Sequence, residues 1–514
     1  MTSLQEKVLR TLEPDPARWK DWLEPKSLAS IARETALKEF RSIMEKARQE
    51  KQKVFVAGDY DCDGLTATSI MVMALRRFGM ETGFYVPDRF REGYGLKPET
   101  VQKAADKGYS VLVTVDNGVR QKEALARAQE LGLQVIVTDH HLIGEDPVCS
   151  LLVHPNTLGE NFRTLCGAAL AFECARALGT DDAYLLMLAM VGSIGDMMEV
   201  RAETRAIIQL GLQQFNRFPE PHLRALCPSG PVNETDISFQ VVPRINSAGR
   251  LADHANANNV VRYFLSRDAA AISQFAKQLD KLNTERKNLS AWTAKRCEQC
   301  LQEEEPFLLI KDPEFHEGIV GLAAGALCQA HDKPVAVATA FAGGFKGSMR
   351  APAGFDCVAF FADFPDFDQF GGHAQAAGFS IAEENWEALE SYIRAKMADW
   401  KWEKPESSVL EIEPRELNVA SIASLDALRP FGTGFKMPTF VLREPQVVQD
   451  TALSGGLHKK FILTSGLECL RFRISSQETS LPRESIAAFY GAPSISVFRG
   501  TRRPNFLIDR IEGR

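Results

Sequence analysis

The chain has 514 residues, of which 45% are hydrophobic and 25% are charged, which is the composition of an ordinary globular protein. This length is too great for one hydrophobic core and predicts about three or four domains. A net charge of −7 argues against a protein that coats DNA through its overall charge, so a nucleic-acid partner would need a local basic groove.

The first 50 residues alternate helical patterns with prolines, and we expect an N-terminal helical segment there. From residue 53 to 155, short β-rich runs alternate with amphipathic stretches such as 64–78 and 119–131. Continuous apolar strands separated by helices predict a parallel sheet covered on both faces, with its ligand crevice at the carboxyl ends of the strands. The expected strands are residues 53–58, 82–87, 110–116, 133–139 and 150–155.

The rest of the chain predicts a long helix followed by two further units. Residues 266–305 contain no Gly or Pro and are rich in charge, so we expect one long, partly exposed helix that bridges two domains. Residues 306–403 predict a second, smaller α/β unit. Residues 404–514 turn to short strands and turns, which predict a small β-barrel or sandwich.

The cysteines and the N-terminus bear on the compartment. Ten cysteines are scattered without a disulfide-like framework, which fits a reducing compartment. Cys297 and Cys300 form a lone CxxC in a helical pattern with no second pair nearby, so we do not expect a zinc site. The first residues lack the apolar core of a signal peptide, and no apolar run approaches the roughly 20 residues of a membrane span. We therefore expect a cytoplasmic protein.

Three carboxylates follow the first expected strand: Asp59, Asp61 and Asp63, then a glycine. A calcium loop of the form D-x-D-x-D-G needs a Glu at its twelfth position, where this chain has Ile70, and it follows a helix rather than a strand. An acidic helix cap is the other ordinary interpretation, but one Asp would suffice for it. Three clustered carboxylates resist ionising together unless a cation compensates their charge, which favours a metal site.

Further acidic segments follow the neighbouring strands. Asp116 ends one strand, Asp139 with His140 and His141 ends the next, and Asp196 lies in an otherwise apolar helical run. The carboxyl ends of parallel strands meet at one edge, so independent helix caps would not gather there. Carboxylates with an imidazole suit a pair of hard or borderline divalent ions, Mn²⁺ or Mg²⁺, and the histidine favours Mn²⁺. Two such ions are typical of phosphoester or phosphoanhydride hydrolysis.

The segments "DYDCDG", "VDNG", "TDHH" and "GSIGD" resemble, in this order, the four motifs of the DHH phosphoesterases. Six further segments resemble the RecJ family of single-strand-specific 5′–3′ exonucleases. These are "VPDRFREGYGL" (86–96), "VVPRINSAGRL" (241–251), "FHEGIVGLAA" (315–324), "GSMRA" (347–351), "FGGHAQAAGFS" (370–380) and "LRPFGTGFKMPTF" (428–440).

This resemblance implies an architecture and an activity. The N-terminal segment 1–50 would be followed by a parallel-sheet DHH domain (51–265). The connecting helix (266–305) would join it to a smaller α/β DHH-associated, substrate-binding domain (306–403). An OB-like β domain (404–514) would come last. The activity would be removal of 5′-mononucleotides from single-stranded DNA by two-metal hydrolysis, in DNA repair and recombination. The implied partners are single-stranded DNA, a single-strand-binding protein and a helicase, with the enzyme itself a monomer.

The resemblance also assigns roles within the metal site. Asp61 would bind one ion and Asp63 the other, with Asp116 bridging them. His140 and Asp196 would complete the shell of the second ion. His141 would contact the scissile phosphate, and Asp139 would support the histidine pair. Asp59 would orient the loop or a metal-bound water. The chain departs from the family at Ala57, where many members have His, so we expect the first ion to bind more weakly.

Arginines near small residues are the candidates for phosphate binding. By resemblance, a group of polar residues would bind the 5′-terminal phosphate and the next backbone unit. It consists of Arg89, Ser348, Arg350, Asn246 and either Arg244 or Arg250. His373, beside two glycines and an expected helix start, would add an anion cradle. A solvated surface arginine is the ordinary alternative for each. Three aromatic residues could stack on bases or pack in the core: Phe90, Tyr94 and Phe345.

Two other functions stay open on the sequence. Another DHH hydrolase would act on very short RNA, cyclic dinucleotides or pyrophosphate, although such enzymes are generally shorter and lack the C-terminal β domain. A non-catalytic replication scaffold related to RecJ would have lost metal ligands, which this chain retains.

Overall fold

The computed structural model describes residues 1–24, 26–301, 305–404, 408–472, 474, 478–479, 481–498 and 500–514. These residues form two compact units. The larger unit comprises residues 29–196 and 211–405, and the smaller unit comprises residues 1–28, 197–210 and 406–514. Among the described residues, no helix is both long and apolar enough to span a membrane.

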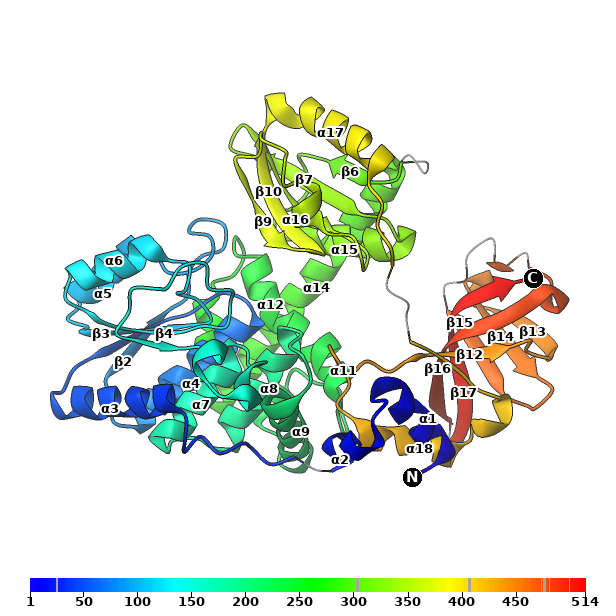
Figure 1. Ribbon diagram of the computed structural model, residues 1–514, viewed down its shortest axis with the longest axis horizontal. Helices are drawn as coiled ribbons and strands as arrows, with labels where there is room; N and C mark the ends of the chain where they lie inside the picture. The colour runs from blue at the N-terminus through cyan, green and yellow to red at the C-terminus, as the bar shows by residue number, and fades with distance from the viewer. Residues whose placement is uncertain are drawn as a thin grey trace. The chain divides into compact units, whose positions relative to one another are not determined.

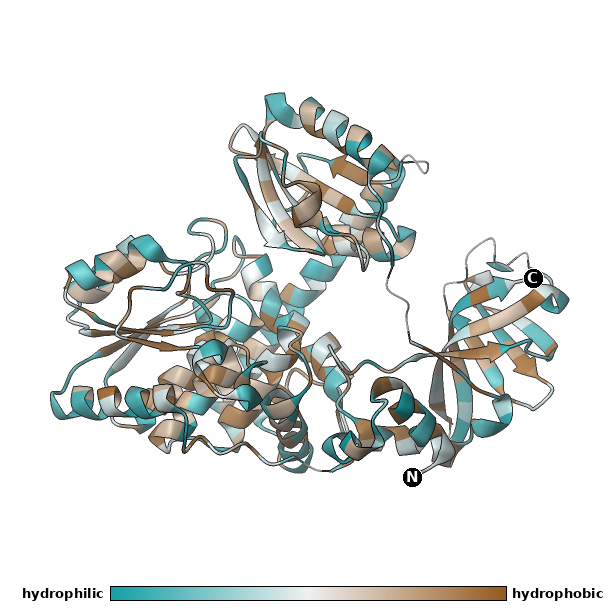
Figure 2. Ribbon diagram, in the orientation of Figure 1, coloured by the Kyte–Doolittle hydropathy of each residue, from teal (hydrophilic) through white to brown (hydrophobic). Residues whose placement is uncertain are grey.

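A five-stranded parallel sheet forms the centre of the larger unit. Its order is β2-β1-β3-β4-β5, and every neighbouring pair is parallel. The side chains of β1 and β3 are buried along their whole length, because helices cover both faces of the sheet, and Figure 2 shows these strands mainly in brown. All five predicted strands are confirmed: β1 Val54–Ala57, β2 Thr82–Tyr85, β3 Val111–Val115, β4 Gln134–Thr138 and β5 Leu151–Val153.

The helices of this sheet lie in two layers (Figure 1). One face carries α5 (Pro98–Asp106) and α6 (Lys122–Glu130), and the other carries α3 (Thr35–Gln49), α4 (Cys62–Arg77) and α7 (Gly167–Leu178). Helix α8 (Ala183–Gly195) packs against α4 and α7. The strands therefore deliver the residues that follow them to one edge, where the acidic segments lie.

A helical region leads from this sheet to a second one. It contains α9 (Ala202–Arg217), α10 (Pro221–Arg224), α11 (Glu234–Asp236), a π-helical turn (Ile237–Val241), α12 (Val242–Arg250) and α13 (Asn258–Leu265). The predicted long helix is α14, which runs for 32 residues from Ala269 to Cys300 and is capped by the Asp268 carboxylate. At 1.5 Å per residue it is about 48 Å long.

The second sheet has the order β6-β7-β8-β10-β9, in which only β6 and β7 are parallel. Its strands are β6 Leu308–Lys311, β7 Val335–Phe341, β8 Gly344–Arg350, β9 Gln369–His373 and β10 Ala376–Ala382, with helices α15 Val320–His331, α16 Cys357–Phe360 and α17 Trp386–Asp399. The helix start expected around His373 is wrong, because this segment is the β9–β10 hairpin. Gly372 has a φ of 152°, and a Cβ there would lie 2.3 Å from the Ala376 carbonyl oxygen.

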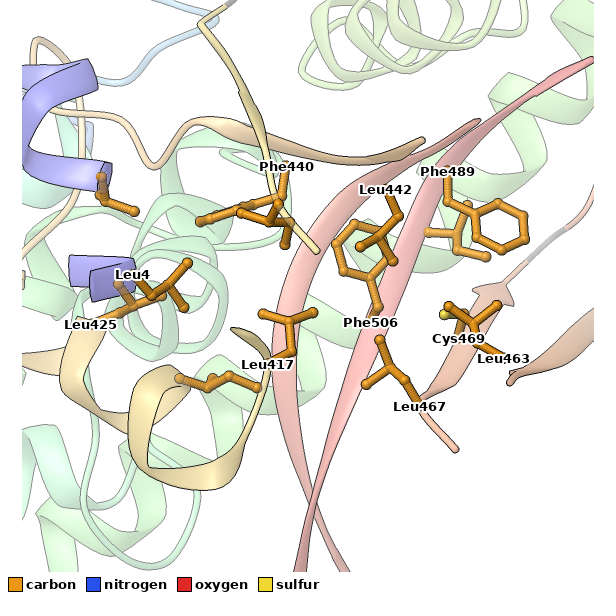
Figure 3. Packing of buried hydrophobic residues seen from close by; sticks show 14 of the residues in the cluster. Leu4, Leu417, Leu425, Phe440, Leu442, Leu463, Leu467, Cys469, Phe489 and Phe506 are labelled. Carbon is orange, nitrogen blue, oxygen red and sulfur yellow. The ribbon is translucent and has the colours of Figure 1, made fainter. Parts of the chain in front are cut away.

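The smaller unit is built on a seven-stranded sheet of order β11-β12-β16-β17-β15-β14-β13. The strands are β11 Val409–Glu411, β12 Thr439–Arg443, β13 Val447–Leu453, β14 His458–Leu463, β15 Glu468–Phe472, β16 Ile486–Phe498 and β17 Thr501–Gly513. Three helices join it: α1 Ser3–Leu12, α2 Lys20–Leu23 and α18 Val419–Ser424. Leu4 of α1 and Leu425 belong to the same buried core as Phe440 and Phe506 of the sheet (Figure 3). The predicted domain boundaries stay predictions.

Candidate metal centre and phosphate site

The sheet edge gathers carboxylates and imidazoles from four chain segments. Ligand atoms within 4.8 Å of one another form three sets: Asp59, Asp61 and Asp116; Asp63, His140 and Asp196; and Asp116, His140 and His141. The third set shares Asp116 with the first and His140 with the second, so the first two sets adjoin. Asp196 lies directly after α8 rather than inside a helix, and its carboxylate is partly exposed.

Asp63 is buried and is held by the N-terminus of α7. Its two carboxylate oxygens accept hydrogen bonds from the backbone N–H groups of Gly167 and Ala168, at 2.7 and 2.8 Å. Free N–H groups and the helix dipole favour a negative charge at this position. Gly192 makes room for it, since a Cβ there would lie 2.7 Å from Asp63 Oδ1.

Asp116 has an unusual backbone conformation, with a φ of 61° in the left-handed region. A non-glycine residue there is strained and needs support from its surroundings. The Asp116 N–H donates to the Thr138 carbonyl at 3.0 Å, and its own carbonyl accepts from the Tyr94 hydroxyl at 3.1 Å. Gly167 packs directly against its side chain, since a Cβ there would lie 2.5 Å from Asp116 Cβ.

The two histidines face different partners. His140 Nε2 lies 3.1 Å from Asp116 Oδ1, 3.6 Å from Asp196 Oδ2 and 3.8 Å from Asp63 Oδ2. His141 Nδ1 lies 2.8 Å from Asp139 Oδ1, and Asp139 also accepts the backbone N–H groups of both histidines. The geometry fits the supporting role predicted for Asp139.

The electrostatics of the cluster oppose ionisation of its carboxylates. Burial, followed by the charge of neighbouring carboxylates, raises the pKa of Asp59, Asp61 and Asp116, and raises that of Asp196 to about 9. Burial lowers the pKa of His140. Asp139 behaves differently. Burial alone would raise its pKa, but the hydrogen bond and the charge of His141 outweigh burial and lower the pKa.

Three buried atoms of the cluster have no hydrogen-bond partner among the described residues: Asp59 Oδ1, Asp116 Oδ1 and His140 Nε2. Buried polar atoms are almost always paired, so unpaired ones gathered in one acidic cluster fit a cation-binding site. Carboxylate oxygens with one imidazole nitrogen are the donor set of Mn²⁺ or Mg²⁺. The residues present therefore fit two divalent ions.

Four guanidinium groups form a second feature, which we call the arginine cluster: Arg89, Arg250, Arg286 and Arg350. Burial, followed by the charges of the other three, lowers the pKa of Arg250 to about 9. Arg350 donates to Ser348 Oγ at 2.8 Å. In the part of the chain that the structure describes, none of the four pairs directly with a carboxylate, although the Asp61 charge still acts on Arg250. Cations held together without direct ion pairs fit a multiply charged anion.

Arg286 is the member of this cluster that sequence reasoning missed. It lies on α14, and its Nε donates to Asn283 Oδ1 at 3.0 Å. Its neighbours in the sequence, "NTERKNL", form no recognisable motif. The only available signal was its position on a helix expected to bridge two domains.

Arg244 and Asn246 lie near the cluster in sequence but have partners of their own. Arg244 pairs with Asp280 of α14 at 2.8 Å and donates to the Gln240 carbonyl at 2.7 Å. Asn246 Oδ1 accepts the Cys62 N–H at 2.7 Å and so fixes the start of α4. These contacts favour a structural role for both, and leave Arg250 as the phosphate candidate of this motif.

The other predicted residues divide between the site and the core. His373 ends β9 and is exposed, so its role stays a prediction. Phe345 is buried against Trp386, which favours core packing over base stacking, and Phe90 contacts the His316 ring. Ala57 ends β1, and its carbonyl accepts from Asn117 Nδ2 at 3.1 Å.

Family models match the three expected parts of the chain in the expected order. The DHH family N-terminal domain matches residues 53–192, the DHHA1 domain matches 304–399, and the RecJ OB domain matches 410–510.

Individual relatives agree with these matches. The single-stranded-DNA-specific exonuclease RecJ of Dickeya dadantii (strain 3937) is 31% identical over 520 residues, which are 91% of this chain and 89% of the relative. The protein of the same name from Bacillus subtilis (strain 168) is 31% identical over 496 residues, and the chain spans 63% of its length.

A solved structure shows the same fold. The crystal structure of RecJ in complex with Mn²⁺ from Thermus thermophilus superposes with a TM-score of 0.84 at 27% identity, covering 100% of this chain and 78% of that one. Its complex with Mg²⁺ gives a TM-score of 0.79 at 26% identity. On its sequence, its fold and the order of the three matched domains along the chain, the protein belongs to the RecJ family.

Proposed function

We propose that the protein is a 5′–3′ exonuclease that removes 5′-mononucleotides from single-stranded DNA by metal-dependent hydrolysis. One observation carries the proposal: two sets of metal-ligating atoms adjoin where Asp116 meets His140, in the same unit as an arginine cluster that has no direct ion pair among the described residues. Relatives named single-stranded-DNA-specific exonuclease RecJ and the Mn²⁺ complex of one of them support it.

The ligand sets divide between two ions. Asp59, Asp61 and Asp116 would hold the first, and Asp63, His140 and Asp196 would hold the second; Asp116 Oδ1 of the first set lies 3.1 Å from His140 Nε2 of the second. Bound Mn²⁺ or Mg²⁺ supplies a nucleophile from water near neutral pH and positive charge for the phosphoryl oxygens. The Ala57 position supplies no imidazole to the first set, so we expect the first ion to bind more weakly than the second.

The protein's own groups position the substrate. The arginine cluster would bind the 5′-terminal phosphate, while His141, held by Asp139, would contact the scissile phosphate. Hydrolysis breaks the bond between phosphorus and the 3′ oxygen of the first nucleotide. The phosphate then stays on the shortened strand, so each cycle regenerates the group that the arginine cluster binds.

The further assignments rest on the family. The β domain at 410–510 is an OB domain, a fold that often binds single strands. We propose that duplex ends need a helicase, that a single-strand-binding protein presents the substrate, and that the enzyme acts as a monomer in the cytoplasm, in repair and recombination. The ligands that a non-catalytic scaffold would have lost are all in place here.

The test compares a 5′-phosphorylated single strand with the same strand in a blunt duplex, in the presence of Mn²⁺. The proposal expects rapid loss of the single strand and little loss of the duplex. Equal digestion of both would refute single-strand specificity. Turnover of dinucleotides far faster than of long strands would instead favour a hydrolase of short oligonucleotides or cyclic dinucleotides.

A further inference from the structure

Tyr94 touches two different parts of the metal centre through one hydroxyl group. Its Oη lies 3.1 Å from the Asp116 carbonyl oxygen and 3.2 Å from His141 Nδ1. Its ring meets the His141 ring edge-on, with centroids 5.5 Å apart at 64°. The side chain is half-buried, with its hydroxyl directed at the protein rather than at solvent.

The contact with Asp116 supports a strained residue. Asp116 has a φ of 61°, a conformation that costs on the order of 1–3 kcal/mol for a residue other than glycine. Such a conformation persists only when neighbouring groups hold it, and the hydrogen bond from Tyr94 fixes the direction of the Asp116 carbonyl. Asp116 belongs to the ligand set of the first ion, and its Oδ1 lies 3.1 Å from Nε2 of His140 in the set of the second, so its backbone conformation bears on both ions.

The contact with His141 selects one form of the imidazole. The Tyr94 hydroxyl has one hydrogen, which it donates to Asp116, so its oxygen can only accept from His141 Nδ1. Asp139 Oδ1 accepts from the same nitrogen at 2.8 Å. Both partners therefore place the hydrogen on Nδ1 and leave Nε2 without a hydrogen and free to accept, as second partners of ligating histidines do.

Tyr94 is itself held in place. Two residues further on, the Leu96 N–H donates to Asn117 Oδ1 at 3.3 Å, and Asn117 in turn donates to the carbonyls of Ala57 and Val115. The hydroxyl of Tyr94 thus approaches the metal centre from a fixed loop.

We infer that Tyr94 is a positioning residue for hydrolysis, whose hydroxyl holds the strained Asp116 backbone and the His141 ring in their working geometry. The inference rests on the proposed function and gives Tyr94 a role different from the base stacking that its sequence context also allows. A stacking residue would act through its ring and would affect substrate binding. A positioning residue acts through its hydroxyl and affects turnover and metal binding.

The deciding variant is Tyr94→Phe, which keeps the ring and removes the hydroxyl. We expect kcat on a 5′-phosphorylated single strand to fall about 10–100-fold with KM within about twofold, and Mn²⁺ affinity to fall about tenfold. The unfolding temperature should stay close to that of the wild type. Tyr85→Phe is the matched control, since it removes a hydroxyl that donates to Glu92 of the same loop at 2.8 and 2.9 Å without touching the metal centre, and it should leave kcat within about twofold.

Each outcome decides the inference. Unchanged kcat and Mn²⁺ affinity in Tyr94→Phe, with a raised KM in Tyr94→Leu, would establish stacking and overturn it. An equal loss in Tyr85→Phe would show that loosening the loop is enough, and would also overturn it. If the wild-type protein does not degrade single strands, the proposed function fails, and the Mn²⁺ titration of Tyr94→Phe still tests the contact with Asp116.

Discussion

The structure predicts that a side chain at Gly167 would displace Asp116 of the metal centre. Gly167 is the first residue of α7, it donates its N–H to Asp63, and it packs against Asp116. A Cβ at this position would lie 2.5 Å from Asp116 Cβ and 2.8 Å from its Oδ1, whereas ordinary contacts begin at 3.4 Å. Gly167→Ala must therefore move the Asp116 side chain or the start of α7 by about 0.9 Å.

The size of the effect follows from that displacement. A misplacement of about 1 Å in a catalytic geometry costs on the order of 100-fold in rate. Overpacking costs about 1–3 kcal/mol in the free energy of unfolding. We therefore expect Gly167→Ala to remain folded while it loses about 100-fold in kcat and about tenfold or more in Mn²⁺ affinity.

The assay measures release of nucleotides from a 5′-labelled single strand, together with calorimetric titration by Mn²⁺ and thermal unfolding. Gly325→Ala in α15 is the control, because its added Cβ would come no closer than 3.9 Å to any neighbour. It should keep its activity and gain slightly in stability. A Gly167→Ala protein with kcat and Mn²⁺ affinity within twofold of the wild type would refute the placement of Asp116 against α7.

The remaining predictions concern charge. In the metal-free protein the pKa of Asp196 is raised to about 9 from 3.8, by burial first and then by Asp63 and Asp61, so the folded state retains a proton that the unfolded state releases. The free energy of unfolding should therefore fall as pH rises from about 4 to about 9. Asp196→Asn should raise the unfolding temperature measured in chelator, by an amount that grows over this pH range. A rise in unfolding temperature that does not depend on pH would contradict this. Arg286→Gln should raise KM about tenfold for a 5′-phosphorylated strand and leave a 5′-hydroxyl strand unchanged. On the same helix, Arg296→Gln, whose guanidinium pairs with Glu314 at 2.9 Å, should leave the ratio between the two strands unchanged, and an equal effect of both variants would contradict the arginine cluster.

Much of the metal centre could be predicted because strand direction fixes it. All five parallel strands were recognisable as apolar runs, and the residues after a parallel strand must reach one edge of the sheet. Asp59, Asp116 and His140 therefore gather as expected. The support of Asp63 by the N-terminus of α7 could not be predicted, because it joins residues more than 100 positions apart without a charge at position 167 or 168.

The misses have similar physical causes. The β9–β10 hairpin was predicted to begin a helix, because small residues such as those around Gly372 suit either structure until strand pairing decides. Arg286 could not be assigned, because a cation on an exposed helix has no local signal that separates a solvated residue from a ligand. Arg244 and Arg250 share one motif, and only the tertiary pair of Arg244 with Asp280 separates their roles.

The most direct test of the central claim compares the fate of a label at the 5′ end with that of a label at the 3′ end of a single strand. A long single strand labelled at its 5′ phosphate is digested with Mn²⁺, and the products are sized from the earliest time point, beside a strand labelled at its 3′ end. The account predicts that the 5′ label appears at once as a mononucleotide, while the 3′ label is retained on progressively shorter strands, and that Asp116→Ala and chelator abolish both changes. A 5′ label that passes through intermediate lengths, or release by Asp116→Ala at the wild-type rate, would contradict it.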